Sequence, residues 1–515
     1  MLAKCYSGAI HGADARAVEI EVFSHEGTSS FAIVGLPDLA VKEAKDRVST
    51  ALRNSGFSSK REYSVTVNLA PADLKKEGPL YDLPIAVSLI KATGRLANEN
   101  LADFGLVGEL ALSGEVRRVN GVLPIVMELK RIGRKVAIVP FDNVEEASVV
   151  DGIDVVPVRT LRQTVDYLNG EIAIPPVRTD LASLVARGAE AGDDFADVKG
   201  QHMAVRAVEV AVAGGHNILM IGSPGAGKTM IARRIPSILP PLSVEEALEV
   251  SRIHSVAGAA KGGGRFVTRR PFRAPHHTVS SIGLLGGGTK PVPGEVSLAH
   301  RGVLFLDEFA EFPRQALEVL RQPLEDGHVG VSRAAAAHDY PSRFMLVAAM
   351  NPCPCGYFND PTHECRCTQS QILKYQRRVS GPLLDRIDIQ VGIPAVSLKE
   401  LRESLPGRSS REIREEVLAA RKIQAARYRG MSGVTCNAEA KSRDLPQICK
   451  MSDEALDELR RVIERLNLSA RAYDRILRVA RTIADIRGAE AVGFDDIMEA
   501  SQYRQLDDVG RSFWA

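Results

Sequence analysis

The chain of 515 residues has room for about three domains at a typical size of about 150 residues. Its net charge is only +2, so composition does not indicate nucleic acid, and such a partner must be met by local basic patches. The N-terminus lacks the apolar segment of a secretory signal, and no apolar run is long enough to span a bilayer. We therefore expect a cytoplasmic protein with no membrane partner.

Residues 1–170 predict a domain of mixed strands and helices. Its β-rich runs cover residues 18–23, 64–68 and 135–139, and they alternate with helical patterns over 39–55 and 83–93. This alternation favours an α+β or α/β domain without a phosphate loop of its own. Residues 171–194 are rich in proline and charge and predict a linker.

Residues 195–394 predict a nucleotide-binding core built on a parallel sheet flanked by helices. An apolar run at 217–221 predicts a buried strand, and 230–235 predict the start of a helix. Between them lie Gly222, Ser223, Pro224, Gly225, Ala226, Gly227, Lys228 and Thr229. The glycines allow backbone N–H groups to surround phosphates, the lysine neutralises the outer phosphates, and the threonine hydroxyl can bind Mg²⁺. The sequence therefore predicts a P-loop for ATP and Mg²⁺.

A second motif consists of an apolar run at 303–306 that ends in two adjacent carboxylates, Asp307 and Glu308. In isolation such a pair would more often be a solvated strand end. Downstream of a P-loop, Asp307 can bind Mg²⁺, and Glu308 can orient and deprotonate the attacking water. Together the two motifs predict nucleotide hydrolysis.

Residues 395–515 predict an all-helical third domain. They are rich in Ala, Leu, Arg and Glu, with helical periodicity over 410–428, 452–466 and 470–487.

Four of the seven cysteines gather within 353–367 as two C-x-C pairs: Cys353 and Cys355, then Cys365 and Cys367. Four thiolates can close a tetrahedral structural Zn²⁺ site, and His363 could replace one of them. A redox or disulfide pair and free thiols remain alternatives. The remaining three cysteines, Cys5, Cys436 and Cys449, stand apart and predict ordinary core or surface positions.

Five segments carry a resemblance that covers essentially the whole chain. They are Asp197-Val-Lys-Gly-Gln-His202, the P-loop, Arg273-Ala-Pro-His-His-Thr278, the stretch 293–308, and Ser380-Gly-Pro-Leu-Leu-Asp-Arg-Ile-Asp388. These segments resemble the YifB/ComM family of magnesium-chelatase-like AAA+ ATPases. The resemblance implies a multidomain α/β protein. It has a Lon-protease-like N-terminal domain of ribosomal S5-like α+β fold, a central AAA+ core and a C-terminal helical lid.

The resemblance also implies further catalytic residues. Asn351, at the end of an apolar run at 345–350, corresponds to sensor 1, although it could be an ordinary strand-to-loop residue. Arg386 corresponds to an arginine finger delivered from a neighbouring subunit, which requires an oligomer. Its alternative is a salt bridge to Asp385 or Asp388, and Arg377 and Arg378 are weaker candidates for the finger. Arg471 corresponds to sensor 2, which would reach the γ-phosphate from the same chain.

Two segments are candidates for DNA contact. Glycines and positive charges at 261–273 and 283–290, including Lys290, are typical of a pore loop, although a solvated basic loop is equally consistent. The runs at 328–333 and from 342 flank a short Ala-rich tip and resemble a helicase hairpin with Arg333 as its DNA contact. His276 and His277 predict structural or domain-contact residues.

The N-terminal domain resembles Lon without its catalytic residues. Leu80 stands where the serine is expected, and Val122 and Leu123 stand where the lysine is expected, so a Ser-Lys peptidase is disfavoured. Ser113 and Lys76 are expected to be solvated. The domain would then serve assembly, substrate loading or partner binding.

The family implies a homo-hexameric, ATP-driven helicase that promotes branch migration of DNA during natural transformation or recombination. Its partners would be single-stranded or branched DNA and possible recombination or competence proteins. A chelatase-like motor subunit and a protein-remodelling ATPase remain the alternatives.

Overall fold

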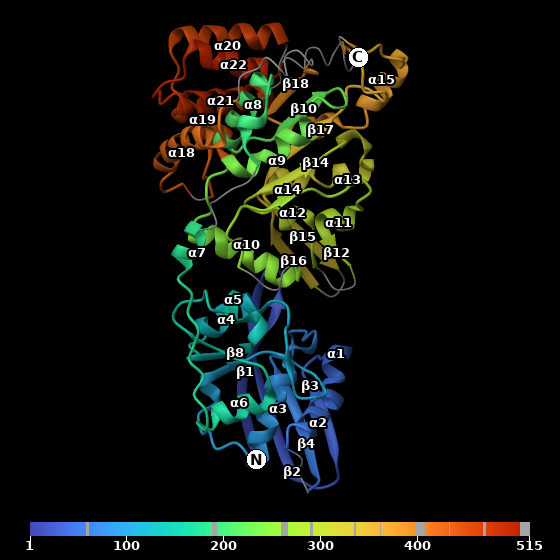
Figure 1. Cartoon of the computed structure of the whole chain (residues 1–515), viewed down its shortest axis with the longest axis vertical. Helices are drawn as coiled ribbons and strands as arrows, with labels where there is room; N and C mark the ends of the chain where they lie inside the picture. Colours follow the sequence, from blue (N-terminus) through green and yellow to red (C-terminus); the bar gives the residue numbers. More distant parts are fainter. Residues whose placement is uncertain are drawn as a thin grey trace.

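The computed structural model describes residues 1–57, 61–187, 193–258, 266–288, 292–333, 336–360, 362–396, 407–431, 433–466 and 470–504. The chain forms three units. The N-terminal sheet lies at one end of the long axis, the P-loop core lies in the middle, and the C-terminal helices lie beside the core at the other end (Figure 1). In the described part of the chain, every helix is too short or too polar to cross a bilayer.

The N-terminal unit is a mixed seven-stranded sheet in the order β3-β4-β2-β1-β5-β8-β9. Its strands are β1 (Leu2–His11), β2 (Asp14–Glu26), β3 (Ser30–Val34), β4 (Tyr63–Ala70), β5 (Phe104–Leu106), β8 (Val136–Pro140) and β9 (Asp154–Val158). Alternate residues Val18, Ile20 and Val22 of β2 are fully buried, because helices cover one face of the sheet. Those helices are α3 (Asp82–Ala92) and α4 (Val122–Arg131), which both pack on β1 and β2.

The remaining N-terminal elements are α1 (Leu39–Lys42), α2 (Ala44–Asn54), β6 (Glu109–Leu110), β7 (Val116–Arg117), α5 (Val144–Ala147) and α6 (Leu161–Leu168). The single helix expected over 39–55 is therefore divided at Glu43. The expected linker contains α7 (Leu181–Arg187), whose Val185 is buried in the N-terminal core. That linker is thus partly packed against the first unit.

The core contains the expected parallel sheet, in the order β11-β14-β17-β10-β18. Its strands are β10 (Ile218–Gly222), β11 (Phe272–Arg273), β14 (Val303–Leu306), β17 (Met345–Met350) and β18 (Ile389–Ile393). All four residues of β14 and all six of β17 are buried, as expected when helices cover both faces of a parallel sheet.

The two faces of this sheet bury different helices. One face packs on α8 (His202–Gly214), α9 (Lys228–Ile238) and the C-terminal helices. The other packs on α10 (Val244–Ala257), α11 (Ser281–Leu285), α12 (Glu295–Leu298), α13 (Arg314–Glu318) and α16 (Gly381–Leu384). Further core elements are β12 (Gly286–Gly287), β13 (Val292–Pro293), α14 (Arg321–Asp326) and α15 (Gln369–Gln376). The predicted hairpin is present as β15 (His328–Arg333) and β16 (Ala336–Pro341).

The C-terminal unit contains the expected helices as α18 (Ser410–Arg427), α20 (Asp453–Leu466) and α21 (Ala470–Ile486), with α19 (Leu445–Ile448) and α22 (Phe494–Gln502). Both α18 and α21 pack on α8 of the core and share its hydrophobic cluster. The position of this unit relative to the core is therefore set by apolar burial as well as by the connecting chain.

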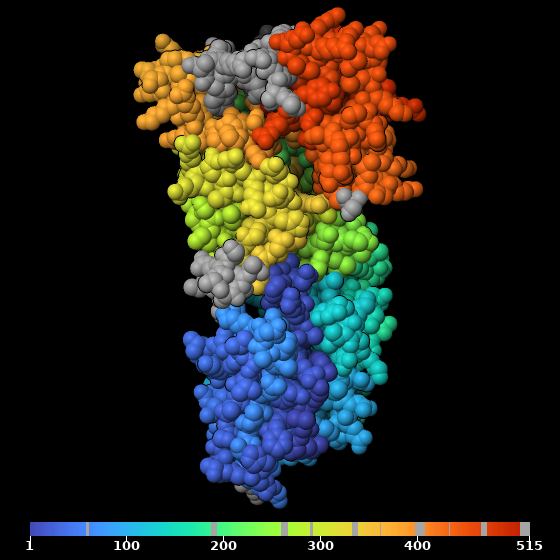
Figure 2. Space-filling view, turned by 180° about the vertical axis from the view of Figure 1, so that it is seen from behind, coloured from blue at the N-terminus to red at the C-terminus, as the bar shows by residue number. Residues whose placement is uncertain are grey.

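The N-terminal unit contacts the core through α10 and the turn between β1 and β2. Gly121 N–H, at the start of α4, donates to Ser255 O of α10 at 3.0 Å. Arg252 of α10 forms an ion pair with Asp14. Gly12 N–H donates to Nδ1 of His338 on β16 at 3.0 Å. Figure 2 shows this turn (dark blue) reaching the middle unit.

Candidate nucleotide-binding site

The P-loop connects the end of β10 to the start of α9. Gly225 and Gly227 have φ angles of +80° and +93°, which L side chains rarely adopt, so these positions require glycine. Gly222 packs against β18, where an added Cβ would lie 2.3 Å from Ile393 O. The loop therefore has the strand-to-helix setting and backbone that a phosphate-binding loop needs.

Lys228 is the buried cation of this loop. Its Nζ donates to Gly222 O at 2.6 Å, to Ser223 O at 2.9 Å and to Asn351 Oδ1 at 3.1 Å. Burial lowers the pKa of Lys228 to about 8 because neutral oxygens replace water only in part. A buried ammonium with neutral partners is a good receptor for an anionic oxygen, so the loop fits a polyphosphate.

Thr229 and Asp307 face each other across the site. Thr229 Oγ1 donates to Asp307 Oδ2 at 2.6 Å, and Asp307 Oδ1 accepts from the backbone N–H of Glu308 at 2.9 Å. A hydroxyl and a carboxylate oxygen are hard ligands of the type that Mg²⁺ uses beside phosphates. These two side chains therefore fit the Mg²⁺ ion that the motifs predict.

Glu308 follows directly, in a left-handed backbone conformation with φ of +52°. Its carboxylate is half-exposed and forms an ion pair with Nδ1 of His277 at 2.9 Å. The ring of His277 in turn lies 4.1 Å from that of His276. A non-glycine residue held in this conformation beside a catalytic motif is a typical sign of a functional constraint.

His277 is a site residue that sequence reasoning assigned to a structural role. It follows β11, and β11 is the sheet neighbour of β14, which ends at Asp307 and Glu308. The carboxyl ends of neighbouring parallel strands meet at one edge, which brings His277 to Glu308. The strand order of the sheet would have identified His277 as a site residue, but local sequence patterns do not reveal that order.

Arg386 and Arg471 lie at the opposite edge of the sheet. Both line a cavity of about 900 Å³ whose wall includes Asn217, Gly302 and Met345, where the strands begin. Arg386 forms an ion pair with Glu325 and donates to Pro382 O at 2.7 Å, so its carboxylate partner is neither Asp385 nor Asp388, which the alternative to the arginine finger had named. The expected reach of Arg471 to its own γ-phosphate site does not match this geometry, because the helix α21 that carries it packs at the strand-start edge.

Comparisons with known proteins identify the family of the chain. Residues 194–401 match the family described as magnesium chelatase, subunit ChlI, while 18–143 and 407–504 match the families of the ChlI subunit and its C-terminal part. YifB of Escherichia coli is 43% identical over 498 residues, 96% of both chains. Competence protein ComM of Haemophilus influenzae is 42% identical over 510 residues, 98% of both chains.

The chain belongs to the YifB/ComM family of magnesium-chelatase-like proteins. Membership in this AAA+ family, with the P-loop and acidic motif in place, indicates an ATPase that uses ATP and Mg²⁺.

A shorter stretch of this YifB/ComM chain is 27% identical to Lon protease 2 of Bacillus subtilis, over 128 residues that form 25% of this chain and 22% of that protein. Leu80 and Leu123 are buried apolar side chains at the positions compared with Lon's serine and lysine. Lys76 was expected to be solvated, and this is wrong. It is fully buried, donates to Pro71 O, and its pKa is lowered by burial. Ser113 is exposed as expected.

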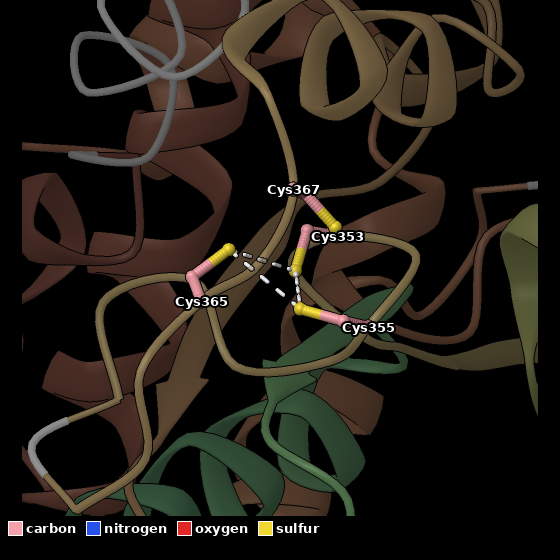
Figure 3. A group of neighbouring side chains, drawn as sticks. All are labelled: Cys353, Cys355, Cys365 and Cys367. Atoms are coloured by element: carbon pink, nitrogen blue, oxygen red, sulfur yellow. Dashed lines mark hydrogen bonds between the residues drawn. The ribbon is translucent and has the colours of Figure 1, made fainter.

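The four clustered cysteines of this family member come together in space (Figure 3). Their sulfur atoms all lie within 4.8 Å of one another, and each cysteine is a free thiol. The geometry does not support the predicted disulfide alternative. Cys5, Cys436 and Cys449 are buried at separate places in the core, which agrees with their expected role as ordinary side chains.

The candidate DNA contacts are described only in part. Lys290 and the run 261–265 lie outside the described residues. Two arginines of the expected pore loop are engaged inside the core. Arg270 donates to Pro240 O and Arg301 O at 2.7 Å, and Arg273 pairs with Glu295 at 2.7 Å. Arg333 lies at the end of β15, where the hairpin turns.

Proposed function

We propose that this chain is an ATP-driven motor that acts as a homo-hexamer and unwinds or branch-migrates DNA. The observation that carries the proposal is the division of the nucleotide-site residues between opposite edges of one sheet. Lys228, Thr229, Asp307 and Asn351 gather at the strand ends, whereas Arg386 and Arg471 lie at the strand starts. A ring of identical subunits brings one edge against the other and completes each site.

The cavity of Arg386 and Arg471 supports a partner of negative charge. Arg475 is one of eight arginines that line it together with Lys441, against six carboxylates, so the cavity has an excess of positive charge. Among the described residues, Nε of Arg386 is buried without a hydrogen-bond acceptor, and Nη1 of Arg475 is buried with only the Asp385 carboxylate near it, at 3.9 Å. Buried donors of this kind normally have partners, and phosphate oxygens at a neighbouring P-loop would supply them.

The residues then divide the hydrolysis of ATP between them. Lys228 and the P-loop hold the outer phosphates, and Thr229 and Asp307 hold Mg²⁺, which neutralises charge on the phosphate oxygens when bound. Asn351 orients the attacking water, and Glu308 accepts its proton as the bond to the γ-phosphorus forms. Arg386 of the next subunit offsets the charge that develops on the transferred group, an effect of about 10³ to 10⁵ in rate in related enzymes.

The hairpin β15–β16 supports coupling to DNA. It lies in the chain between β14, which ends just before Asp307, and β17, which ends just before Asn351. An added Cβ at Gly287 would lie 3.8 Å from Val331, so the β12 loop and the hairpin adjoin each other. We infer that Lys290 and Arg333, from these two insertions, contact the DNA backbone. The position of the hairpin in the chain between both catalytic strands suits a motor that moves DNA when the nucleotide changes.

Two further considerations guide the choice of substrate. ComM of Haemophilus influenzae is named a competence protein, which favours DNA and competence or recombination proteins as partners in the cytoplasm. The three family descriptions refer to a subunit of magnesium chelatase, which favours a chelatase-like motor as the second candidate. A protein-remodelling ATPase is the third.

ATP turnover and strand displacement on DNA separate these candidates. We expect single-stranded or forked DNA to stimulate ATP hydrolysis and a labelled fork to be unwound, with both activities lost in Lys228→Ala. The Arg333→Ala variant should keep basal hydrolysis and lose stimulation. If DNA neither stimulates turnover nor is unwound by the wild type, the DNA motor is wrong. Stimulation by a polypeptide instead would favour the remodeller.

A further inference from the structure

The four clustered cysteines lie next to the nucleotide site in the chain and in space. Cys353 and Cys355 follow β17 and Asn351, whereas Cys365 and Cys367 precede Thr368, the N-cap of α15. In Figure 3, the sulfur atoms of Cys353, Cys355 and Cys365 point toward one another. Their separations are 3.3, 3.6 and 3.8 Å.

These separations fit a metal better than a disulfide. Four sulfurs at about 2.3 Å from a tetrahedral Zn²⁺ are about 3.8 Å apart, whereas a disulfide requires about 2.05 Å. His363 was an alternative ligand, but its ring stacks on Tyr357 at 4.7 Å, and its Nδ1 lies 2.9 Å from Thr362 Oγ1. The thiols therefore form the complete ligand set of a structural Zn²⁺ site.

The loop between the two cysteine pairs packs directly on the P-loop. Gly356 has a φ of +88°, and a Cβ added there would lie 2.5 Å from Pro224 Cδ and 3.9 Å from Asn351 Cγ. The Ser223 side chain lowers the pKa of the Asp360 carboxyl, which indicates that these two side chains are neighbours. The cysteine loop thus contacts two P-loop residues and the amide that binds Lys228.

The far side of the loop is also fixed. Gln376, near the end of α15, is buried and donates from Nε2 to Pro352 O at 3.0 Å. Thr368 and Gln371 form a capping box at the start of the same helix. Since the helix and β17 are firmly placed, the loop between them depends on the sulfur cluster to remain folded against Pro224.

We propose that Cys353, Cys355, Cys365 and Cys367 bind one Zn²⁺ as thiolates, and that this metal holds the loop against the P-loop so that its occupancy controls nucleotide affinity. This inference rests on the nucleotide-binding part of the proposed function. Removal of the metal frees a loop of more than ten residues, and the ordering of that loop must then be provided by nucleotide binding itself. The free energy needed to order the loop reduces the free energy of nucleotide binding, so the affinity is weaker.

The test uses the full chain purified without chelator. Metal content is measured first, and bound metal is then released with a thiol-specific mercurial and a chromogenic chelator. The Kd of a fluorescent ATP analogue with Mg²⁺ is measured before release, after release and after reductant and Zn²⁺ are returned. We expect one zinc per chain, a loss of affinity of about tenfold or more on release, and recovery on return. Zinc well below one per chain, or an unchanged Kd after release, overturns the proposal.

Three variants sharpen the result. Cys365→Ser should lose zinc and nucleotide affinity together. Asp360→Ala breaks the contact with Ser223 but leaves all four thiols, so it should keep one zinc and still bind nucleotide more weakly. Cys5→Ala removes a buried thiol of the N-terminal sheet and should change neither quantity. If Asp360→Ala binds nucleotide as the wild type does, the link between the loop and the P-loop is wrong.

Two failures are distinguishable. If zinc-loaded wild type fails to bind nucleotide, the proposed ATPase function fails. If nucleotide binds and zinc is absent, only the metal proposal fails. Should Cys365→Ser not fold, as judged by circular dichroism, the metal-release experiment on the wild type decides the outcome by itself.

Discussion

Burial in the site lowers the pKa of Lys228, and this predicts that nucleotide binding depends on pH. Its pKa of about 8 in the free protein must rise when phosphate oxygens replace its neutral partners. Below about pH 8, Lys228 is charged in both the free and the nucleotide-bound protein. Above about pH 8, Lys228 of the free protein must take up a proton when nucleotide binds. We expect the Kd to be flat near neutrality and to rise with pH above about 8.

The measurement is titration calorimetry at about pH 8.5 in two buffers of different ionisation enthalpy, together with Kd values across the range. Proton uptake on binding should appear as a buffer-dependent enthalpy. A Kd that is constant from neutrality to about pH 9.5 contradicts the assignment of Lys228 as the perturbed phosphate ligand.

His277 predicts a restraint on the catalytic base. Its contact with Glu308, at 2.9 Å, occupies the carboxylate that must orient the attacking water and accept its proton, so the imidazole competes with water for that carboxylate. We expect His277→Ala to raise DNA-independent ATP turnover several-fold, to leave KM nearly unchanged and to reduce stimulation by DNA. His276→Ala tests the neighbouring ring, which lies 4.1 Å from that of His277 and contacts Thr278, and it should have a smaller effect. Basal turnover equal to that of the wild type in His277→Ala would show that the pair does not restrain Glu308.

At this scale the sequence identified residues that directly follow apolar strands. Asp307 and Asn351 each follow a strand directly, Lys228 begins the helix that follows the P-loop after β10, and parallel strands bring such ends to one edge. His277 required the knowledge that β11 adjoins β14, and the side on which Arg471 lies required the docking of the C-terminal helices. Both depend on contacts between distant segments, which local patterns do not encode.

Among the elements, long apolar or amphipathic runs were predictable and their interruptions were not. The strands β10, β14 and β17 and the helices α18, α20 and α21 lie within about two residues of their expected bounds. The division between α1 and α2 at Glu43 lies in a stretch whose local composition favours one helix. The helix α7 within the expected linker forms because its apolar residues find a surface on the N-terminal core, which is a tertiary effect.

The helices α18 and α21 are joined by a buried charge network centred on Asp485. This carboxylate is 1% exposed and accepts hydrogen bonds from Arg427 at 2.5 and 2.7 Å, from Arg481 at 3.1 Å and from Asn437 at 2.9 Å. Its removal leaves buried guanidinium groups without their anion, which costs about 3 to 5 kcal/mol.

We therefore expect Asp485→Ala to lower the stability of the C-terminal unit by about that amount, measured as an earlier helical transition in denaturant. Glu454→Ala, at an exposed position of α20, is the control and should leave the transition in place. An unshifted transition in Asp485→Ala would mean that the network does not hold the two helices together.

At the scale of the whole molecule, the N-terminal unit packs directly against the candidate DNA hairpin β15–β16. The rings of His11 and His338 lie 5.0 Å apart, and Ala13 is buried in the core cluster that includes Val329 and Val331 of β15. A domain fixed to this hairpin can limit the hairpin's movement. We propose that a partner bound to the N-terminal unit acts on DNA contact in this way, which would give the unit a role in assembly or substrate loading.

The proposed completion of each site between neighbouring subunits predicts the behaviour of mixed oligomers. Lys228→Ala has a defective P-loop and intact arginines, and Arg386→Ala has the reverse, so each protein alone should hydrolyse little ATP. In a mixture, an Arg386→Ala subunit beside a Lys228→Ala subunit has one complete site at their shared edge. With equal amounts mixed at random, about a quarter of the interfaces are of this kind, and we expect turnover near that fraction of the wild type.

The same mixing experiment shows whether Arg471 acts on the P-loop of its own subunit or on that of a neighbour. Its place in the cavity with Arg386 predicts that Arg471→Ala mixed with Lys228→Ala also recovers activity, because the intact Arg471 is supplied by the neighbour. If Arg471 acted on its own P-loop, every subunit in that mixture would lack either Lys228 or Arg471, and turnover would stay at the level of the separate variants. Recovery with Arg386→Ala but not with Arg471→Ala would assign the two arginines to different subunits. Recovery with neither would mean that sites are not completed between subunits, and the ring would lose its physical basis.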